Sequence, residues 1–191
     1  MRVRRSGATF TTPTPRLWSC SSARPRERHP TLTLSRQTLT LLALLGSAAL
    51  LAAAFAFQHL GGMAPCPLCV WQRWPHAAAV AIGGIALATG WGGLAWLGAL
   101  AALGSAGIGG FHVGVEQGWW EGLQACVAGS IAGISTADLL NPAVDVAAPV
   151  RCDAIPWAML GISMAGWNVI ASLGLAGIWA LAATAARPAA A

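Results

Sequence analysis

Two cysteines three positions apart have the spacing of a redox-active pair. Cys66 and Cys69 enclose Pro67 and Leu68. A zinc site would need a second cysteine pair or histidines, and haem attachment would need a histidine directly after the second cysteine, where Val70 stands. Redox exchange needs only two sulfurs that can close a small ring. The spacing therefore favours a dithiol that exchanges electrons, and we expect no metal there.

The residues after this pair could tune its acidity. Pro67 suits the first turn of a helix, which would place Cys69 in that turn and let the helix dipole stabilise its thiolate. Arg73 lies four residues further on and would share a helix face with Cys69. Its charge would lower the pKa of that thiol, and its donors could hold a carbonyl oxygen. The alternative role for Arg73 is an interfacial anchor that reaches lipid headgroups.

Cys126 and Cys152 form a second pair, twenty-six residues apart. Taken alone, this pair predicts a structural disulfide that stabilises the fold by about 3–4 kcal/mol. If it faces the same compartment as Cys66 and Cys69, the two pairs could instead exchange by thiolate attack. The fifth cysteine, Cys20, is expected to be a reduced thiol without a role.

The composition indicates lipid as the solvent. Hydrophobic residues make up 56% of the 191 residues and charged residues only 9%, whereas soluble domains carry about 25% charged residues. The net charge of +5 comes from arginine, and eight of the eleven arginines lie in Met1–Arg36. A nucleic-acid-binding protein would carry its basic residues on the folded body, so we expect no nucleic-acid partner.

Uncharged stretches predict an all-α membrane protein, a bundle of four transmembrane helices. Leu39–Phe57 would cover about 29 Å as a helix, close to the roughly 30 Å hydrocarbon core. Ala77–Phe111 is too long for one crossing and must fold back at Gly90–Gly93. Within a membrane domain 38–186, the spans are about 39–58, 74–89, 94–113 and 157–183, and the two outward cysteine-bearing loops are about 59–73 and 114–156.

Arginine sets the predicted orientation of the four spans. Nine arginines lie in the two tails, while the cysteine loops hold only Arg73 and Arg151. By the positive-inside rule both tails are cytoplasmic, and all four loop cysteines face an oxidising compartment. The segment 1–37 is expected to be a disordered cytoplasmic tail, an extension upstream of the true start or a transit peptide, and 187–191 to be a short cytoplasmic tail.

Four sequence segments form a recognisable set: Pro65-Cys66-Pro67-Leu68-Cys69-Val70-Trp71-Gln72-Arg73, Phe111-His112-Val113-Gly114-Val115-Glu116-Gln117-Gly118-Trp119-Trp120, Pro149-Val150-Arg151-Cys152-Asp153 and Ala165-Gly166-Trp167-Asn168. These motifs resemble those of the disulfide bond formation protein B (DsbB) family. The resemblance covers about Leu39 to Ala183 and is specific, because four cysteines fall in register with four spans. One departure is Gln72, where some members carry glutamate, and the roles of Gln72 and Glu116 stay open.

The resemblance implies a thiol relay at a bacterial inner membrane, with the cysteine loops in the periplasm. Cys126 would receive electrons from a soluble thioredoxin-fold oxidase of the DsbA type, and Cys152 would exchange with Cys66. Cys69 would lie next to a quinone, ubiquinone or menaquinone, with Arg73 beside it. His112 matches a histidine that the family places near the quinone, although it could also be an interfacial histidine. The implied disulfides are Cys66–Cys69 and Cys126–Cys152.

The expected function is thus that of a protein-dithiol:quinone oxidoreductase that reoxidises its periplasmic partner and sustains disulfide bond formation. Three alternatives use the same residues. The chain could run electrons outward as a reductant carrier, because the sequence does not give the potentials. It could be a membrane metal- or haem-handling protein with structural disulfides. It could also be a four-span structural protein whose disulfides only staple its loops.

Overall fold

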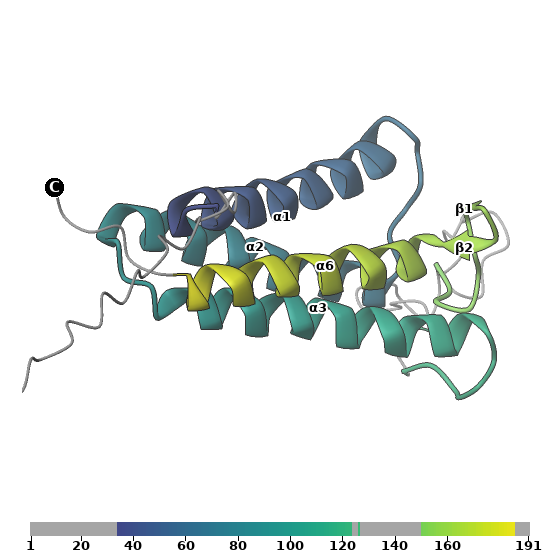
Figure 1. The fold of residues 1–191 in the computed structure, drawn as a ribbon. Coiled ribbons are helices and arrows are strands. Elements are labelled where there is room, and N and C mark those ends of the chain that lie inside the picture. Colours follow the sequence, from purple (N-terminus) through teal and green to yellow (C-terminus); the bar gives the residue numbers. More distant parts are fainter. Residues whose placement is uncertain (1–33, 124–125, 127–149, 186–191) are drawn as a thin grey trace, which may run out of the picture. The chain divides into compact units, whose positions relative to one another are not determined.

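The computed structural model describes residues 34–123, 126 and 150–185, and these are mostly helical (Figure 1). Most of the predicted N-terminal tail and the tail 187–191 lie outside the described residues, as does most of the loop before Cys152. The elements are α1 (Arg36–His59), α2 (Pro67–Thr89), α3 (Leu94–Glu116), β1 (Ala158–Met159), β2 (Ile162–Ser163) and α6 (Met164–Thr184).

The described helices close into a ring in the order α1, α2, α3, α6. Helix α3 contacts both α2 and α6, and α1 contacts α2 and α6 from the other side. Small residues line the contacts: Gly98 of α3 faces the indole of Trp179 of α6, which is fully buried. Lipid tails are as apolar as leucine, so helices in a membrane associate through such close packing.

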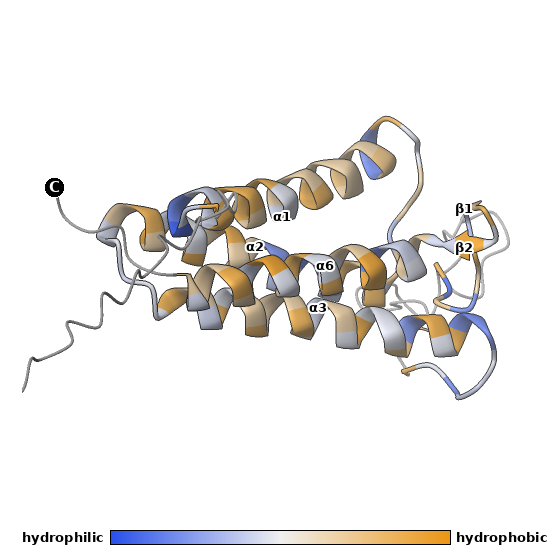
Figure 2. Ribbon diagram, viewed as in Figure 1, coloured by the Kyte–Doolittle hydropathy of each residue, from blue (hydrophilic) through white to orange (hydrophobic). Residues whose placement is uncertain are grey.

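Three of these helices, α1, α3 and α6, are long and apolar enough to cross a membrane. Hydrophobic residues cover most of their length, and hydrophilic residues gather towards helix ends (Figure 2). Helix α2 is not among the three, and its first half carries Gln72, Arg73 and His76. The described residues therefore establish a mostly helical protein with three candidate spans.

Helix α2 begins earlier than the predicted span 74–89. Its first residue is Pro67, and the Cys66 sulfur accepts the backbone N–H of Cys69, which caps the helix. The other end lies where the sequence predicts a turn: α2 ends at Thr89, and Gly90 follows with a left-handed φ of 68°, which glycine adopts at no steric cost. The cysteine pair thus starts the helix, as the position of Pro67 predicted.

The fourth helix begins at Met164, later than the predicted start at 157. Residues 158–163 form an antiparallel hairpin, in which Ala158 pairs with Ser163 and Met159 with Ile162. Its turn has positive φ at Leu160 (54°) and Gly161 (77°). The Ser163 hydroxyl then accepts the backbone N–H of Gly166 and caps α6. An uncharged stretch alone does not reveal such a hairpin, because its residues are as apolar as those of the helix.

Candidate functional site

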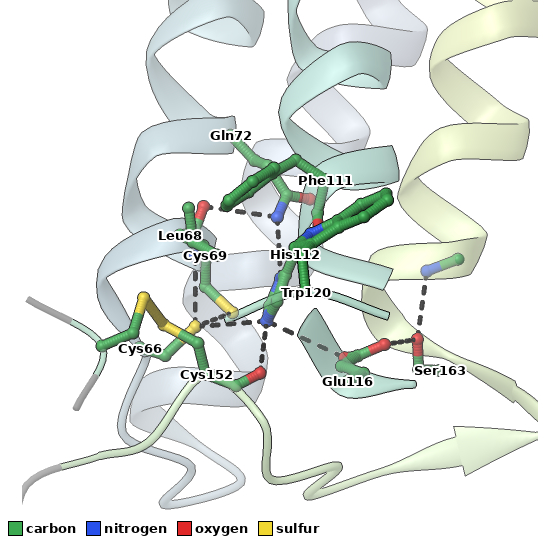
Figure 3. Close-up of polar contacts among 12 residues, drawn as sticks. Cys66, Leu68, Cys69, Gln72, Phe111, His112, Glu116, Trp120, Cys152 and Ser163 are labelled. Carbon is green, nitrogen blue, oxygen red and sulfur yellow. Dashed lines mark hydrogen bonds and ion pairs between the residues drawn. A yellow bond between two sulfur atoms is a disulfide. The ribbon is translucent and has the colours of Figure 1, made fainter. Parts of the chain in front are cut away.

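The two sulfurs of the first pair lie side by side at the start of α2. Cys66 Sγ and Cys69 Sγ are unbonded and 2.9 Å apart, within hydrogen-bond distance. The backbone N–H of Cys69 donates to Cys66 Sγ at 3.3 Å, and His112 Nε2 of α3 lies 3.6 Å from the same sulfur (Figure 3). Cys66 is thus the sulfur that the structure surrounds with hydrogen-bond donors.

This environment makes the Cys66 thiol more acidic than an ordinary cysteine thiol. The hydrogen bond with the Cys69 thiol, opposed by burial and assisted by His112 and the Cys69 backbone N–H, lowers the pKa of Cys66 from 9.0 to about 4. The sequence had predicted that the helix dipole would favour a thiolate on Cys69. Because Cys66 occupies the N-cap, it receives the free N–H of the first turn, and its thiolate is stabilised instead.

We expect a pH dependence that follows from this acidity. In the reduced protein, the thiolate absorbance near 240 nm that depends on Cys66 should stay constant from pH 8 to about 5 and disappear with a midpoint near 4, because protonation of a group with a lowered pKa begins only near that pKa. The difference spectrum between the wild type and Cys66→Ser measures it. A midpoint near 9 would show that the donors around Cys66 do not stabilise its thiolate.

The second cysteine pair is a disulfide that packs against the first pair. Cys126 and Cys152 are bonded, and both are buried. They share a cluster with Cys66, Leu68 of α2 and Val115 of α3. The carbonyl oxygen of Cys152 lies 3.1 Å from His112 Nε2, which ties the second pair to the first. The structure therefore brings all four loop cysteines to one end of the helices.

Aromatic residues fold the chain back after α3. The Trp120 indole N–H donates to the carbonyl oxygen of Phe111 at 3.0 Å, and the two rings stack with centroids 5.7 Å apart (Figure 3). Gly118 permits the reversal with a φ of 68°. This return brings Cys126 towards the start of α2.

Arg73 is held by α1 and not by the cysteines. Its guanidinium donates to Gln58 Oε1 at 2.6 Å and to the Ala54 carbonyl oxygen at 3.5 Å, and it lies 4.9 Å from the centre of the Phe55 ring. A guanidinium has five donors in a rigid fork, so donors remain for a further acceptor. Gln58, which had no predicted role, fixes the direction of this fork.

A cavity of about 470 Å³ joins Arg73 to the first cysteine pair. Its walls are mostly apolar side chains of α1, α6 and the segment after Cys152, and Cys66, Cys69, Arg73 and His112 all line it. Cavities of this size with an apolar wall and few polar groups suit small organic ligands. An aromatic ring with polar oxygens fits this lining, because the wall is apolar and Arg73 offers donors.

A buried polar cluster lies beside this cavity, which His76 and Asn168 line. His76 is 3% exposed, and its Nε2 lies 3.0 Å from Asn168 Oδ1, 3.0 Å from Ser105 Oγ and 3.3 Å from Ser172 Oγ. The sequence gives little signal for this cluster. Its members lie on α2, α3 and α6, and only packing sets which faces of these helices meet.

Glu116 and Gln72 flank His112 from opposite sides. The Ser163 hydroxyl donates to Glu116 Oε2 at 2.5 Å, and Glu116 Oε1 lies 3.8 Å from His112 Nε2. Gln72 Nε2 lies 3.1 Å from His112 Nδ1 (Figure 3). Side chains at i and i+4 share a helix face, so the spacing of His112 and Glu116 in the sequence allows them to pair. The contact of Gln72 with His112 joins two helices, and sequence spacing does not predict it.

Sulfur–sulfur chemistry fits this arrangement better than a zinc site. Cys66, Cys69 and His112 offer ligand atoms within 4.8 Å of one another. Two thiolates on one tetrahedral zinc ion stand roughly 3.8 Å apart, as Zn–S bonds of about 2.3 Å require. The two sulfurs here are 2.9 Å apart, so they would have to separate before both could bind the ion.

Comparison with known proteins decides the family. The family model described as "Disulfide bond formation protein DsbB" matches residues 36–182. The chain belongs to the DsbB family. The match runs from the first residue of α1 almost to the end of α6, so it includes both cysteine pairs. The chain is accordingly a membrane oxidoreductase of disulfide bond formation, as its sequence motifs predicted.

Individual DsbB relatives agree over most of their length. "Disulfide bond formation protein B" of Methylococcus capsulatus is 37% identical over 150 residues, which are 74% of this chain and 90% of that protein. Proteins of the same name from Verminephrobacter eiseniae (35% over 152 residues, 73% and 82%) and Albidiferax ferrireducens (32% over 145 residues, 71% and 83%) are similar. No solved structure matches the chain.

Proposed function

We propose that this DsbB-family protein takes electrons from a soluble thioredoxin-fold dithiol oxidase of the DsbA type and passes them to a membrane quinone. The observation that carries the proposal is that the second cysteine pair packs against the first, which lines a cavity together with Arg73. In this relay a partner thiolate attacks Cys126, and Cys152 leaves. Cys152 then attacks Cys66 of the oxidised first pair, and Cys69 leaves.

The bonds present in the structure suit one stage of this relay. Cys126 and Cys152 are bonded, whereas Cys66 and Cys69 are unbonded and adjacent. This is the state after the electrons have reached the first pair. Cys69, Arg73 and the apolar walls would hold the quinone, and His112 lines the same space. A quinone held there would supply the two-electron acceptor for the first cysteine pair.

Four crossings complete the proposal. Helix α2 has 23 residues and covers about 35 Å, enough to cross alongside α1, α3 and α6. Its polar residues Gln72 and His76 face the other helices and are buried, so lipid does not meet them. We propose that both tails are cytoplasmic, that the cysteine loops are periplasmic and that the protein lies in the bacterial inner membrane. The domain limits 38–186 belong to the same proposal.

Replacing Arg73 tests the quinone site. Arg73→Gln should raise the KM for quinone roughly 10-fold to 100-fold, because a hydrogen bond from a charged donor is lost. The rate at which the partner dithiol reduces the cysteines should not change, because Arg73 contacts α1 and the cavity rather than the sulfurs. Steady-state assays at varied quinone concentration measure the KM. Arg36→Gln, at the other end of α1, is the control, and an unchanged KM in Arg73→Gln would reduce Arg73 to an anchor.

The metal-handling alternative is tested on the same preparation. Protein purified with its four loop cysteines should contain extractable quinone and less than one zinc ion per ten chains. Stoichiometric zinc that is lost in Cys66→Ser, with no quinone, would favour the metal-handling function instead.

A further inference from the structure

His112 lies between the two cysteine pairs, and its contacts fix which of its nitrogens carries the proton. Gln72 Nε2 lies 3.3 Å from the carbonyl oxygen of Leu68. A carbonyl oxygen only accepts, so this atom of Gln72 is the amide nitrogen and a donor. The same amide nitrogen lies 3.1 Å from His112 Nδ1. Nδ1 must therefore accept, and the proton of the neutral imidazole sits on Nε2.

The surroundings of Nε2 agree independently with this tautomer. Its nearest neighbour is the carbonyl oxygen of Cys152 at 3.1 Å, which can only accept. The Cys66 sulfur at 3.6 Å and Glu116 Oε1 at 3.8 Å complete the set. A single N–H thus faces three acceptors, and these belong to the first cysteine pair, to the second pair and to the end of α3. All of these side chains are buried.

We propose that His112, held as the Nε2–H tautomer by Gln72, is the hydrogen-bond donor for exchange between the two cysteine pairs. Its N–H holds the Cys152 backbone beside Cys66 and stabilises the thiolate of Cys66. Gln72 is a positioning residue that acts through the imidazole. The inference rests on the proposed relay, and it gives both ring nitrogens of His112 partners in the protein.

The step that His112 assists is the release of Cys66. After Cys152 has attacked Cys66, the two pairs are joined by a Cys66–Cys152 disulfide. The Cys126 thiolate then attacks Cys152: the Cys126–Cys152 bond forms, the Cys66–Cys152 bond breaks, and the electron pair stays on the Cys66 sulfur. No proton has to move, because Cys66 leaves as a thiolate and the Nε2–H donates to it. The structure has the bonds of this product.

Exchange is measured without the quinone step. Quinone-depleted, fully oxidised protein is mixed with a reduced thioredoxin-fold partner, and acid quench with alkylation and mass spectrometry follows the appearance of the free Cys66 thiol. His112→Met, which has no donor, should slow this appearance roughly 10-fold to 100-fold. His112→Gln, whose amide can donate from nearly the same position, should recover most of the rate. The exchange rate is the readout, because the KM for quinone would respond to any change in the cavity that His112 lines.

The opposite pattern would overturn the inference. If His112→Met exchanged at the wild-type rate and only its KM for quinone rose, His112 would be a quinone ligand. If the wild type formed no free Cys66 and Cys69 thiols at all, the relay itself would fail, which is a different result.

The tautomer is tested in the wild-type protein, so the inference does not depend on a variant that folds. With ¹⁵N-labelled histidine, the His112 resonances, assigned by their loss in His112→Gln, should show a protonated Nε2 and an unprotonated Nδ1. Gln72→Met should abolish this preference. A protonated Nδ1 in the wild type would contradict the assignment of both residues.

Discussion

Quinone reduction by a dithiol partner should fall at least 1,000-fold when Cys69 is replaced by serine. Without Cys69 the first pair cannot form a disulfide, so Cys152 has no oxidised sulfur to attack and the second pair stays reduced after one turnover. The Cys69 sulfur lies 2.9 Å from Cys66 and lines the cavity with Arg73, and no other cysteine among the described residues has this position. Absorbance of the quinone during turnover measures the loss.

A matched control is available for this variant. Cys20→Ser removes the one cysteine that the sequence separates from both pairs, and it should leave the rate unchanged. Wild-type turnover in Cys69→Ser would rule out the proposed relay, because electrons would then reach the quinone without the first pair.

A covalent complex with the partner should form through Cys126 and disappear in Cys126→Ser. A thioredoxin-fold partner that keeps only its nucleophilic cysteine attacks Cys126, and Cys152 leaves towards the first pair. With no second thiol on the partner, the mixed disulfide persists. Non-reducing electrophoresis detects the complex, and mass spectrometry of the linked peptides identifies the cysteine. Turnover with the intact partner should also fall at least 1,000-fold in Cys126→Ser.

The linked peptide decides between two accounts of the second pair. A partner attached to Cys152 or to Cys66 would reverse the proposed order of the sulfurs. No complex in the wild type would leave Cys126–Cys152 as a structural disulfide, the alternative that the spacing of the pair alone supports.

The sequence predicted the parts of the site that depend on residue type and short spacing. The Cys66–Cys69 motif, Arg73 on the same helix and the turn at Gly90 could all be read from it. It misplaced the start of α6, because the hairpin at 158–163 is as apolar as a helix. The cysteine motif predicted the start of α2 at Pro67, although the uncharged stretch that marks the span begins only after Arg73.

Contacts between helices were the part that the sequence could not give. The donor set around Cys66 depends on His112, forty-six positions away, and the direction of the Arg73 guanidinium depends on Gln58. Likewise, His76 lies within hydrogen-bond distance of serines of α3 and α6. Such pairings follow from how the helices face one another, and hydrophobic periodicity within an almost uniformly apolar helix does not determine that.

The direction of electron flow separates the proposed enzyme from a carrier that runs electrons outward. The low pKa of Cys66 stabilises the reduced form of the first pair as a thiolate, which makes that pair the better oxidant. An inward flow of electrons from the partner to the cavity requires that the first pair accept electrons readily from the second pair at the exchange step.

The most direct test places the purified protein in liposomes that contain quinone and adds reduced thioredoxin-fold partner. The loss of quinone absorbance and the loss of partner thiols are measured in the same sample. We expect one quinone reduced for each disulfide formed in the partner, and no reduction in a variant without the four loop cysteines. Disulfides formed without loss of quinone, or quinone reduced in the cysteine-free variant, would contradict it.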